Sequence, residues 1–264
     1  MGGIFLRILL TNDDGIDAPG IQALREVLNP EHELLLAAPS EQRSASGHAI
    51  TMGRPLLARH YRYASASEGW GIDGTPADCV RIGLELMGDV RPDLLISGIN
   101  FGANLGRDVF YSGTVSAAVE GTLMGVPSIA VSLASPDPAG FEWTARFIRW
   151  WIRFGEFCKP PAGVVYNVNV PSLRTRLPSA IRSVKLGQRE YVNHCRRSDD
   201  TGDQAYFWLT GRVSERREPD DTDVGAHQLG YITLTPLHLD WTAYPVLRAE
   251  DLCGPLQQLP DGAF

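Results

Sequence analysis

The sequence predicts an α/β protein with a mostly parallel sheet, and three observations support this. Short apolar runs of strand length recur at residues 4–10, 33–38, 92–100, 126–133 and 164–170. Segments with helical character separate successive runs. The second run is almost continuously Leu and Ala, which is typical of a strand buried on both faces. Strands and helices that alternate in this way form βαβ units, which cross over right-handed into a parallel sheet.

The composition is that of a soluble globular protein. The chain has 264 residues, of which 44% are hydrophobic and 21% charged, enough for one large domain or a domain with an elaboration. The formal net charge of −7 argues against a nucleic-acid polymer as partner. A small anionic substrate remains compatible, because a local metal ion and helix dipoles outweigh the global charge.

Cysteine spacing and the N-terminus indicate the compartment. The four cysteines form no CxxC pair, which argues against a zinc site and a dense disulfide framework. The N-terminal apolar run is too short for a signal peptide, and no run reaches the length of a membrane span. We therefore expect a cytoplasmic protein with reduced thiols and no membrane contact.

The first predicted strand, residues 4–10, stops at Asp13, Asp14 and Gly15. In parallel α/β sheets ligands bind outside the carboxyl ends of the strands. Two adjacent carboxylates repel each other unless a cation or a proton lies between them, and a divalent metal with oxygen ligands would explain the pair. A turn or a helix cap also explains it, because Asn, Asp and Gly are common turn residues.

The second predicted strand, residues 33–38, follows a helix expected over residues 18–28 and ends in the polar loop 39–48. Neighbouring parallel strands end at the same edge, so this loop is expected beside the aspartate pair. Ser44 offers a neutral oxygen to a metal there. A solvated surface loop would have the same composition.

A second helix is expected after residues 50–73, which contain only short β-prone pieces. Thr75 is a favourable N-cap, Pro76 suits the first helical position, and Asp78 suits the first turn. These positions give Asp78 a structural role.

The third core strand, residues 92–100, ends at Asn100. Glycines at positions 98, 102 and 106 indicate either backbone close to a ligand or tight turns. The chain contains neither a GxGxxG fingerprint nor a GxxxxGK[ST] P-loop, which counts against ordinary dinucleotide or ATP binding.

Ser112 is a plausible N-cap for a helix of small residues that runs to about residue 125. The N–H groups of Gly113 and Thr114 then lie at the positive end of the helix dipole, where a phosphate is well held. A plain helix cap packed against the sheet is the alternative. The run at 126–133 is the next buried strand.

The later part of the chain changes in character. Residues 141–157 form an amphipathic helix with one narrow polar stripe, expected to pack on the sheet and on a partner. After the strand at 164–170, residues 172–228 are expected to form projecting hairpins that include a strand at 205–213. A last strand at 230–235 leads into a weak C-terminal helix.

Three strands thus end in oxygen-bearing side chains, at the aspartate pair, at the loop of Ser44 and at Asn100. Oxygen donors of mixed charge suit Mg²⁺, Mn²⁺ or Ca²⁺ better than zinc. Such an ion polarises a phosphoryl oxygen and lowers the pKa of a bound water. With the helix start at residues 112–114 beside it, hydrolysis of a phosphate ester is the natural reaction.

These stretches also resemble the SurE (survival protein E) family, whose members are metal-dependent nucleoside monophosphate phosphatases. Five ordered motifs carry the resemblance, and three later stretches extend it over nearly the whole chain. The motifs are at residues 11–21, 38–44, 74–79, 97–106 and 111–115, and the later stretches are at 167–171, 222–224 and 233–242.

The resemblance implies a single domain over residues 1–264, with a Rossmann-like three-layer catalytic core (1–171) and a hairpin arm, last core strand and C-terminal segment (172–264). The arm and a C-terminal helix would exchange between subunits of a homodimer or homotetramer. The departures lie in the charged stretch 194–221. The implied ligands of one divalent cation per subunit, Mg²⁺, Mn²⁺ or another divalent ion, are Asp13, Asp14, Ser44 and Asn100, the two aspartates being catalytic. The implied phosphate contacts are Asn104, Ser112, Gly113 and Thr114.

The leading hypothesis is a 5′-nucleotidase in which the aspartates hold the ion. Either an aspartate attacks phosphorus directly or it orients a metal-bound water, and water is favoured because an attacking aspartate would have to be free of at least one metal bond. One alternative keeps the site but acts mainly on 3′-nucleotides or short polyphosphate. Another is a non-catalytic nucleotide or metal sensor. A haloacid-dehalogenase-type phosphatase is disfavoured because no DxD motif follows the first strand.

Overall fold

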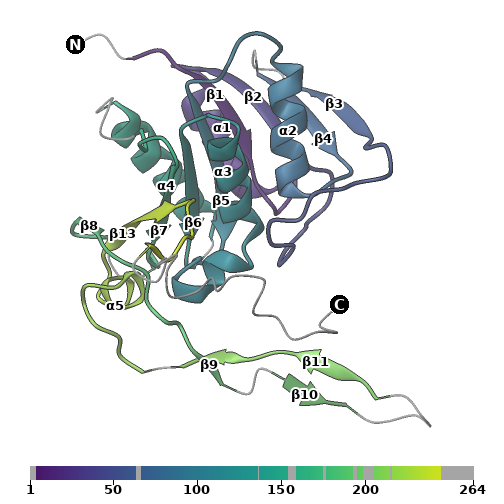
Figure 1. Ribbon diagram of the computed structural model, residues 1–264. Coiled ribbons are helices and arrows are strands. Elements are labelled where there is room, and N and C mark those ends of the chain that lie inside the picture. Colours follow the sequence, from purple (N-terminus) through teal and green to yellow (C-terminus); the bar gives the residue numbers. More distant parts are fainter. Residues whose placement is uncertain are drawn as a thin grey trace, which may run out of the picture.

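A nine-stranded sheet forms the centre of the molecule (Figure 1). The computed structural model describes residues 4–63, 67–135, 137–153, 159–174, 177–192, 195–198, 205–214 and 216–244. Within them the strand order is β3-β4-β2-β1-β5-β6-β7-β13-β8. The strands are β1 (Arg7–Thr11), β2 (Glu33–Pro39), β3 (Ala58–Arg62), β4 (Glu68–Ile72), β5 (Leu94–Phe101), β6 (Ser128–Leu133), β7 (Val164–Val170), β8 (Ile181–Ser183) and β13 (Ile232–His238).

The sheet is mostly parallel, as the sequence predicts. Only β3 with β4 and β7 with β13 pair antiparallel among the pairings of this sheet. The other pairs are parallel, including those of β1 with β2 and with β5. Strands β8 and β13 both lie beyond residue 171 and belong to this sheet, so the C-terminal part of the chain completes the core.

Helices cover both faces of the sheet and give three layers (Figure 1). Helices α1 (Pro19–Leu28) and α4 (Pro138–Ile152) pack together on one face, and α2 (Pro76–Leu86) and α3 (Gly113–Leu123) on the other. In no described helix is there an apolar stretch long enough to span a membrane.

The alternation of side chains along β1 explains why its apolar run is continuous. Ile8 and Leu10 point into the cluster shared with α1 and α4, whereas Leu9 points into the cluster shared with α2 and α3. Successive residues of a strand face opposite sides, so a strand covered on both sides needs apolar residues at every position.

The predicted start of the second helix is confirmed. The Thr75 hydroxyl accepts the N–H of Asp78 at 3.1 Å, and the Asp78 carboxylate accepts the N–H of Thr75 at 2.9 Å. This reciprocal pair is a capping box, which satisfies two N–H groups that a helix start otherwise leaves free. The structural role assigned to Asp78 therefore holds.

Several predicted boundaries are wrong by a few residues. Strands β5 and β6, for example, each begin two residues later than predicted. Strand β1 begins at Arg7 rather than at residue 4. Helix α4 begins at Pro138, three residues early, because the Asp137 side chain caps it by accepting the N–H of Gly140 at 2.8 Å. The predicted end of this helix, residues 154–157, lies outside the described residues.

The predicted strand over 205–213 is two strands in different hairpins. Strand β11 (Phe207–Leu209) pairs with β10 (Cys195–Arg197), and β12 (Arg212–Val213) pairs with β9 (Tyr191–Val192). Figure 1 shows this arm extending away from the core. The projecting hairpins are therefore confirmed, although residues 205–213 contribute one strand to each of two hairpins instead of a single strand.

The last strand is also longer than predicted, and one helix was not predicted. Strand β13 continues to His238. Helix α5 (Asp223–Gln228) lies in a stretch expected to form hairpins, and the Thr222 hydroxyl caps it by accepting the N–H of Gly225 at 3.1 Å. The expected C-terminal helix falls largely outside the described residues, which end at 244.

Asp223 joins three segments of the chain. Its buried carboxylate accepts the N–H groups of Gly106 at 2.8 Å, Gly187 at 2.7 Å and Val224 at 2.8 Å. Burial raises the pKa of Asp223, and these three N–H groups lower it in part. This side chain thereby ties the short 3₁₀ helix η1 (Gly106–Phe110), the start of the arm and α5 together.

We expect Asp223→Asn to lower the free energy of unfolding by about 2–4 kcal/mol, because an amide NH₂ would face backbone donors and leave them unpaired. Urea unfolding monitored by circular dichroism measures this. Asp221→Asn is the control, since the Asp221 carboxylate is exposed and pairs with Lys185, and loss of this pair is expected to change stability little. Equal effects of the two substitutions would refute the role given to Asp223.

Candidate active site

The strand order brings the predicted site residues together. Strand β1 lies between β2 and β5, so the loops after these three strands meet at one edge of the sheet. A cleft of about 1260 Å³ opens there. The predicted residues that line it are Asp13, Asp14, Ser44, Asn100, Asn104 and Ser112. Gly113 and Thr114 do not line it but lie behind Asp13.

Asp13 is buried against the start of α3. Only 5% of the residue is exposed, and the Thr114 hydroxyl donates a short hydrogen bond to its carboxylate. A Cβ at Gly113 would lie 2.7 Å from the Cβ of Asp13, so only glycine allows this approach. The positive end of α3 therefore faces Asp13 itself, in addition to the cleft.

Burial disfavours the charge on both aspartates. It raises the pKa of Asp13 to about 6; the hydrogen bond from Thr114 lowers that pKa, and the neighbouring Asp14 raises it. Burial also raises the pKa of Asp14, while the N–H of Phe101 and the amide of Gln42 lower it. Two carboxylates whose ionised forms are disfavoured in this way gain stability when a cation lies between them.

Sequence reasoning gave Gln42 no role, but the structure places it between two predicted ligands. Its Nε2 donates to Ser44 Oγ at 2.9 Å and lies 3.3 Å from Asp14 Oδ1. It thus links the loop after β2 to the turn after β1. The sequence signal was the spacing of two between Gln42 and Ser44, which alone is too common to point to a site.

Asn100 is oriented by the loop that follows it. Its Nδ2 donates to the carbonyl of Gly102 at 2.7 Å, so Oδ1 is the atom left for a ligand. The register of β5 against β6 shifts between Ser97 and Asn100, which redirects the end of the strand. Carboxylate, amide and hydroxyl oxygens together suit a hard divalent cation.

Among the described residues, no group of three His, Cys, Asp or Glu side chains is placed to hold a metal. A cation at the aspartate pair would therefore need neutral oxygens to complete its shell. Ser44 and Asn100 supply such oxygens on the same cleft. The residues present fit a Mg²⁺- or Mn²⁺-type site and do not fit zinc.

Asn104 is held by side chains of the neighbouring strands. Its N–H donates to Asn169 Oδ1 at 2.7 Å, and its carbonyl accepts from Asn167 Nδ2 at 2.8 Å. Its own Nδ2 donates to Ser132 Oγ at 2.9 Å. Asn104 lines the cleft, but one hydrogen of its side-chain amide is already used in the bond to the buried Ser132.

The cleft is acidic overall, with four carboxylates and two guanidinium groups in its lining. Arg189 lies 2.7 Å from Asp108 and Arg107 bonds to Gln188, so both guanidinium groups have partners. Burial lowers the pKa of His227 to about 4, which keeps this imidazole neutral. The four carboxylates are those of Asp13, Asp14, Asp108 and Glu190. An anionic substrate therefore needs an added cation to bind here.

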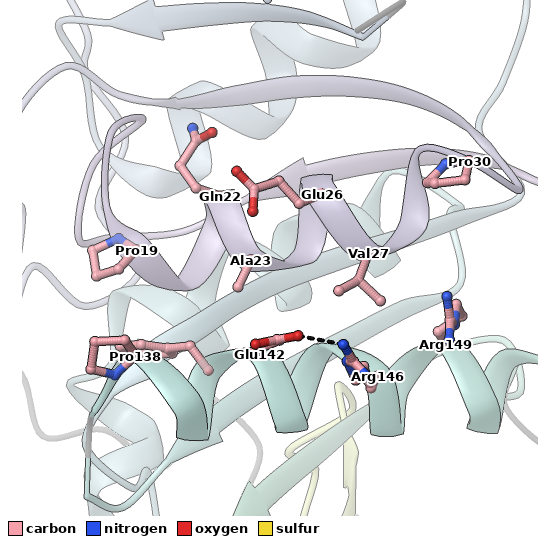
Figure 2. A pocket seen from close by; sticks show the side chains of 11 residues that line it. Pro19, Gln22, Ala23, Glu26, Val27, Pro30, Pro138, Glu142, Arg146 and Arg149 are labelled. Carbon is pink, nitrogen blue, oxygen red and sulfur yellow. Dashed lines mark hydrogen bonds and ion pairs between the residues drawn. The ribbon is translucent and has the colours of Figure 1, made fainter.

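A second cavity of about 610 Å³ lies between α1 and α4 (Figure 2). Pro19, Glu26 and Pro138 are among its lining residues, and Glu142 pairs with Arg146 across one helical turn. It contains none of the predicted site residues. The partner interface expected on α4 stays a prediction.

Comparison with known proteins identifies the family. The model of the family described as Survival protein SurE matches residues 8–193. The chain belongs to the SurE family.

Individual SurE relatives match along nearly the whole chain. The 5′-nucleotidase SurE of Pelotomaculum thermopropionicum is 46% identical over 246 residues, which cover 92% of this chain and 93% of the relative. That of Moorella thermoacetica is 45% identical, covering 90% of this chain and 92% of the relative. The crystal structure of the SurE protein from Aquifex aeolicus matches with a TM-score of 0.80 at 37% identity, covering 91% of this chain and 96% of that one.

The buried charge of Asp13 predicts a pH-dependent stability in metal-free protein. Because the pKa of Asp13 rises from 3.8 to about 6 on folding, its stabilising contribution is present below about pH 4 and is lost as the pH rises through 6. The free energy of unfolding is therefore expected to fall by up to roughly 3 kcal/mol as the pH rises, and Asp13→Asn should abolish this fall. Urea unfolding in EDTA at several pH values measures it.

The exposed neighbour Asp17 provides the control for this experiment. Asp17→Asn should follow the wild-type pH profile. Profiles of wild type and Asp13→Asn that run parallel from pH 4 to pH 8 would contradict the buried-charge account.

Proposed function

We propose that this SurE-family chain is a metal-dependent phosphatase that hydrolyses nucleoside 5′-monophosphates to nucleoside and phosphate. The observation that carries the proposal is the buried Asp13 beside the half-buried Asp14, with the neutral oxygens of Ser44 and Asn100 on the same acidic cleft. A dianionic phosphate would be repelled by this cleft unless a divalent cation is bound first. The curated names of the relatives, 5′-nucleotidase SurE, support the same reaction.

One divalent cation, Mg²⁺ or Mn²⁺, would be held by Asp13, Asp14, Ser44 and Asn100. When bound, it would supply Lewis-acid polarisation of a phosphoryl oxygen. Gln42 orients Asp14 and Ser44 toward it. The aspartates are proposed to orient the attacking water rather than to form a bond to phosphorus, because both are engaged in holding the ion. Isolation of a phosphorylated aspartate during turnover would overturn this assignment.

The phosphate is proposed to lie between the aspartates and the start of α3. Ser112 and Asn104 line the cleft and would contact the phosphoryl oxygens. Gly113 and Thr114 are proposed to act through the positive end of the helix and through the position of Asp13.

The proposal includes the organisation of the whole chain. We propose one SurE-like domain, with the catalytic core in residues 1–171 and the arm, last strand and C-terminal segment in 172–264. The pairing of β13 with β7 supports a single unit. A homodimer or homotetramer through the arm is supported by its exposed aromatic residues Tyr206, Phe207 and Trp208. A cytoplasmic location is supported by the free thiols of Cys79 and Cys195.

Phosphate release from a substrate panel tests the function. The panel is nucleoside 5′-monophosphates, 3′-monophosphates and tripolyphosphate, each with Mg²⁺, Mn²⁺ or EDTA. We expect metal-dependent release that is greatest for the 5′-monophosphates, and a loss of at least about a hundredfold in Asp13→Asn. Asp17→Asn should retain activity.

Other outcomes would redirect the proposal. Turnover that resists both EDTA and Asp13→Asn would mean that the aspartate pair is structural. Nucleotide binding without any phosphate release would favour a sensor. Faster release from 3′-monophosphates or tripolyphosphate would change the substrate class at the same site.

Removal of the Gln42 amide tests the proposed ion site separately from catalysis. Gln42→Ala is expected to weaken Mn²⁺ binding by about tenfold to a hundredfold, because Asp14 and Ser44 lose a shared hydrogen-bond donor. Titration followed by the electron paramagnetic resonance of free Mn²⁺ measures this. Glu41→Ala, the exposed neighbour, is the control, and equal affinities in both variants would count against the site.

A further inference from the structure

Two aromatic side chains border the polar end of the cleft and remain exposed. Phe101 is 65% exposed and Tyr111 is 68% exposed, and both line the cleft. Phe101 directly follows Asn100, and Tyr111 directly precedes Ser112. Each aromatic residue is therefore next in the chain to a residue proposed to act on the metal or the phosphate.

Hydrogen bonds hold the backbone of each aromatic residue in place, whereas its ring is exposed and packs in no ring pair of the described residues. The N–H of Phe101 donates to Asp14 at 3.1 Å. The N–H of Tyr111 donates to the carbonyl of Asp108 at 3.0 Å, and its carbonyl accepts the N–H of Gly47 at 3.2 Å. No ring pair within the described part of the chain includes Phe101 or Tyr111.

The arm supplies an apolar wall to the same cleft. Val192, Leu209 and Val213 line it from the hairpins. Tyr191 joins them, and its hydroxyl donates to Asp108 at 2.8 Å, which connects the arm to η1. The cleft thus combines an oxygen-rich end with aromatic and aliphatic walls, whereas a site for polyphosphate would need cations along its length.

We propose that Phe101 and Tyr111 form the nucleobase subsite, in which the planar base packs against the faces of these rings. This inference rests on the proposed function and names the part of the substrate that the walls recognise. Every base has a π-face, so stacking of this kind is tolerant of sequence and predicts activity on purine and pyrimidine nucleotides alike. It also predicts that a sugar phosphate without a base is a poorer substrate.

The test compares AMP with ribose 5-phosphate, which shares the phosphate and the ribose but lacks the base. In Phe101→Ala and Tyr111→Ala we expect kcat/KM for AMP to fall about tenfold, mainly through KM, because base–aromatic stacking is lost. The values for ribose 5-phosphate should stay unchanged. The ring-retaining variants Phe101→Tyr and Tyr111→Phe should recover activity on AMP.

Phe5→Ala provides a matched control. Phe5 is 66% exposed, like Phe101, but it precedes β1 and so lies at the opposite end of that strand from the cleft. The kcat/KM of this variant for AMP and for ribose 5-phosphate should equal that of the wild type. Light scattering on each variant shows whether the oligomeric mass is retained.

Three results would overturn the subsite. The first is an unchanged AMP to ribose 5-phosphate ratio in both alanine variants. The second is an equal loss on both substrates. The third is a change of oligomeric mass that accounts for the loss, which would make the rings an interface. If the wild type hydrolyses neither substrate, the proposed function fails separately, and calorimetric adenosine binding decides the subsite: weaker binding in the alanine variants supports it, and equal binding refutes it.

Discussion

The burial of Asp13 against the start of α3 is the constraint on which the site depends. Removing a carboxylate from water is costly, and here the Thr114 hydroxyl and the positive helix end offset only part of that cost. The absence of a side chain at Gly113 is what lets the helix come close enough. The remaining cost makes the aspartate pair a place where a cation is favoured, so the fold itself prepares the proposed ion site.

The parallel sheet determines which residues can join Asp13 there. Strands β2 and β5 are the neighbours of β1, so the loops that follow them lie beside the turn of Asp13. Their loops provide Ser44 and Asn100, while Gln42 holds Ser44 against Asp14. Asp223 fixes the other side of the cleft by holding η1, the start of the arm and α5 through three N–H groups. Two buried carboxylates thus organise the two sides of one cleft.

Much of this arrangement could be predicted from the sequence, because it follows from local rules. The apolar runs predicted the core strands, and Thr75, Pro76 and Asp78 predicted a helix start that the capping box confirms. The βαβ spacing predicted a parallel sheet, and β1 does pair parallel with β2. The hairpins could not be placed in register, since short exposed strands have no buried face to fix their pairing. Helix α5 was missed because its six residues are too few to show an apolar period.

The contacts that the predicted site residues make could not be predicted from the sequence, for a different reason. That Thr114 bonds to Asp13, and that Gln42 joins Asp14 to Ser44, depends on distances between segments far apart in the chain. The cleft walls are less constrained than its polar end. The N–H of Phe101 holds Asp14, whereas the rings of Phe101 and Tyr111 are exposed and join no ring pair among the described residues. Their side chains can therefore change without cost to the aspartate pair, which separates the residues proposed to carry the chemistry from those proposed to contact the base.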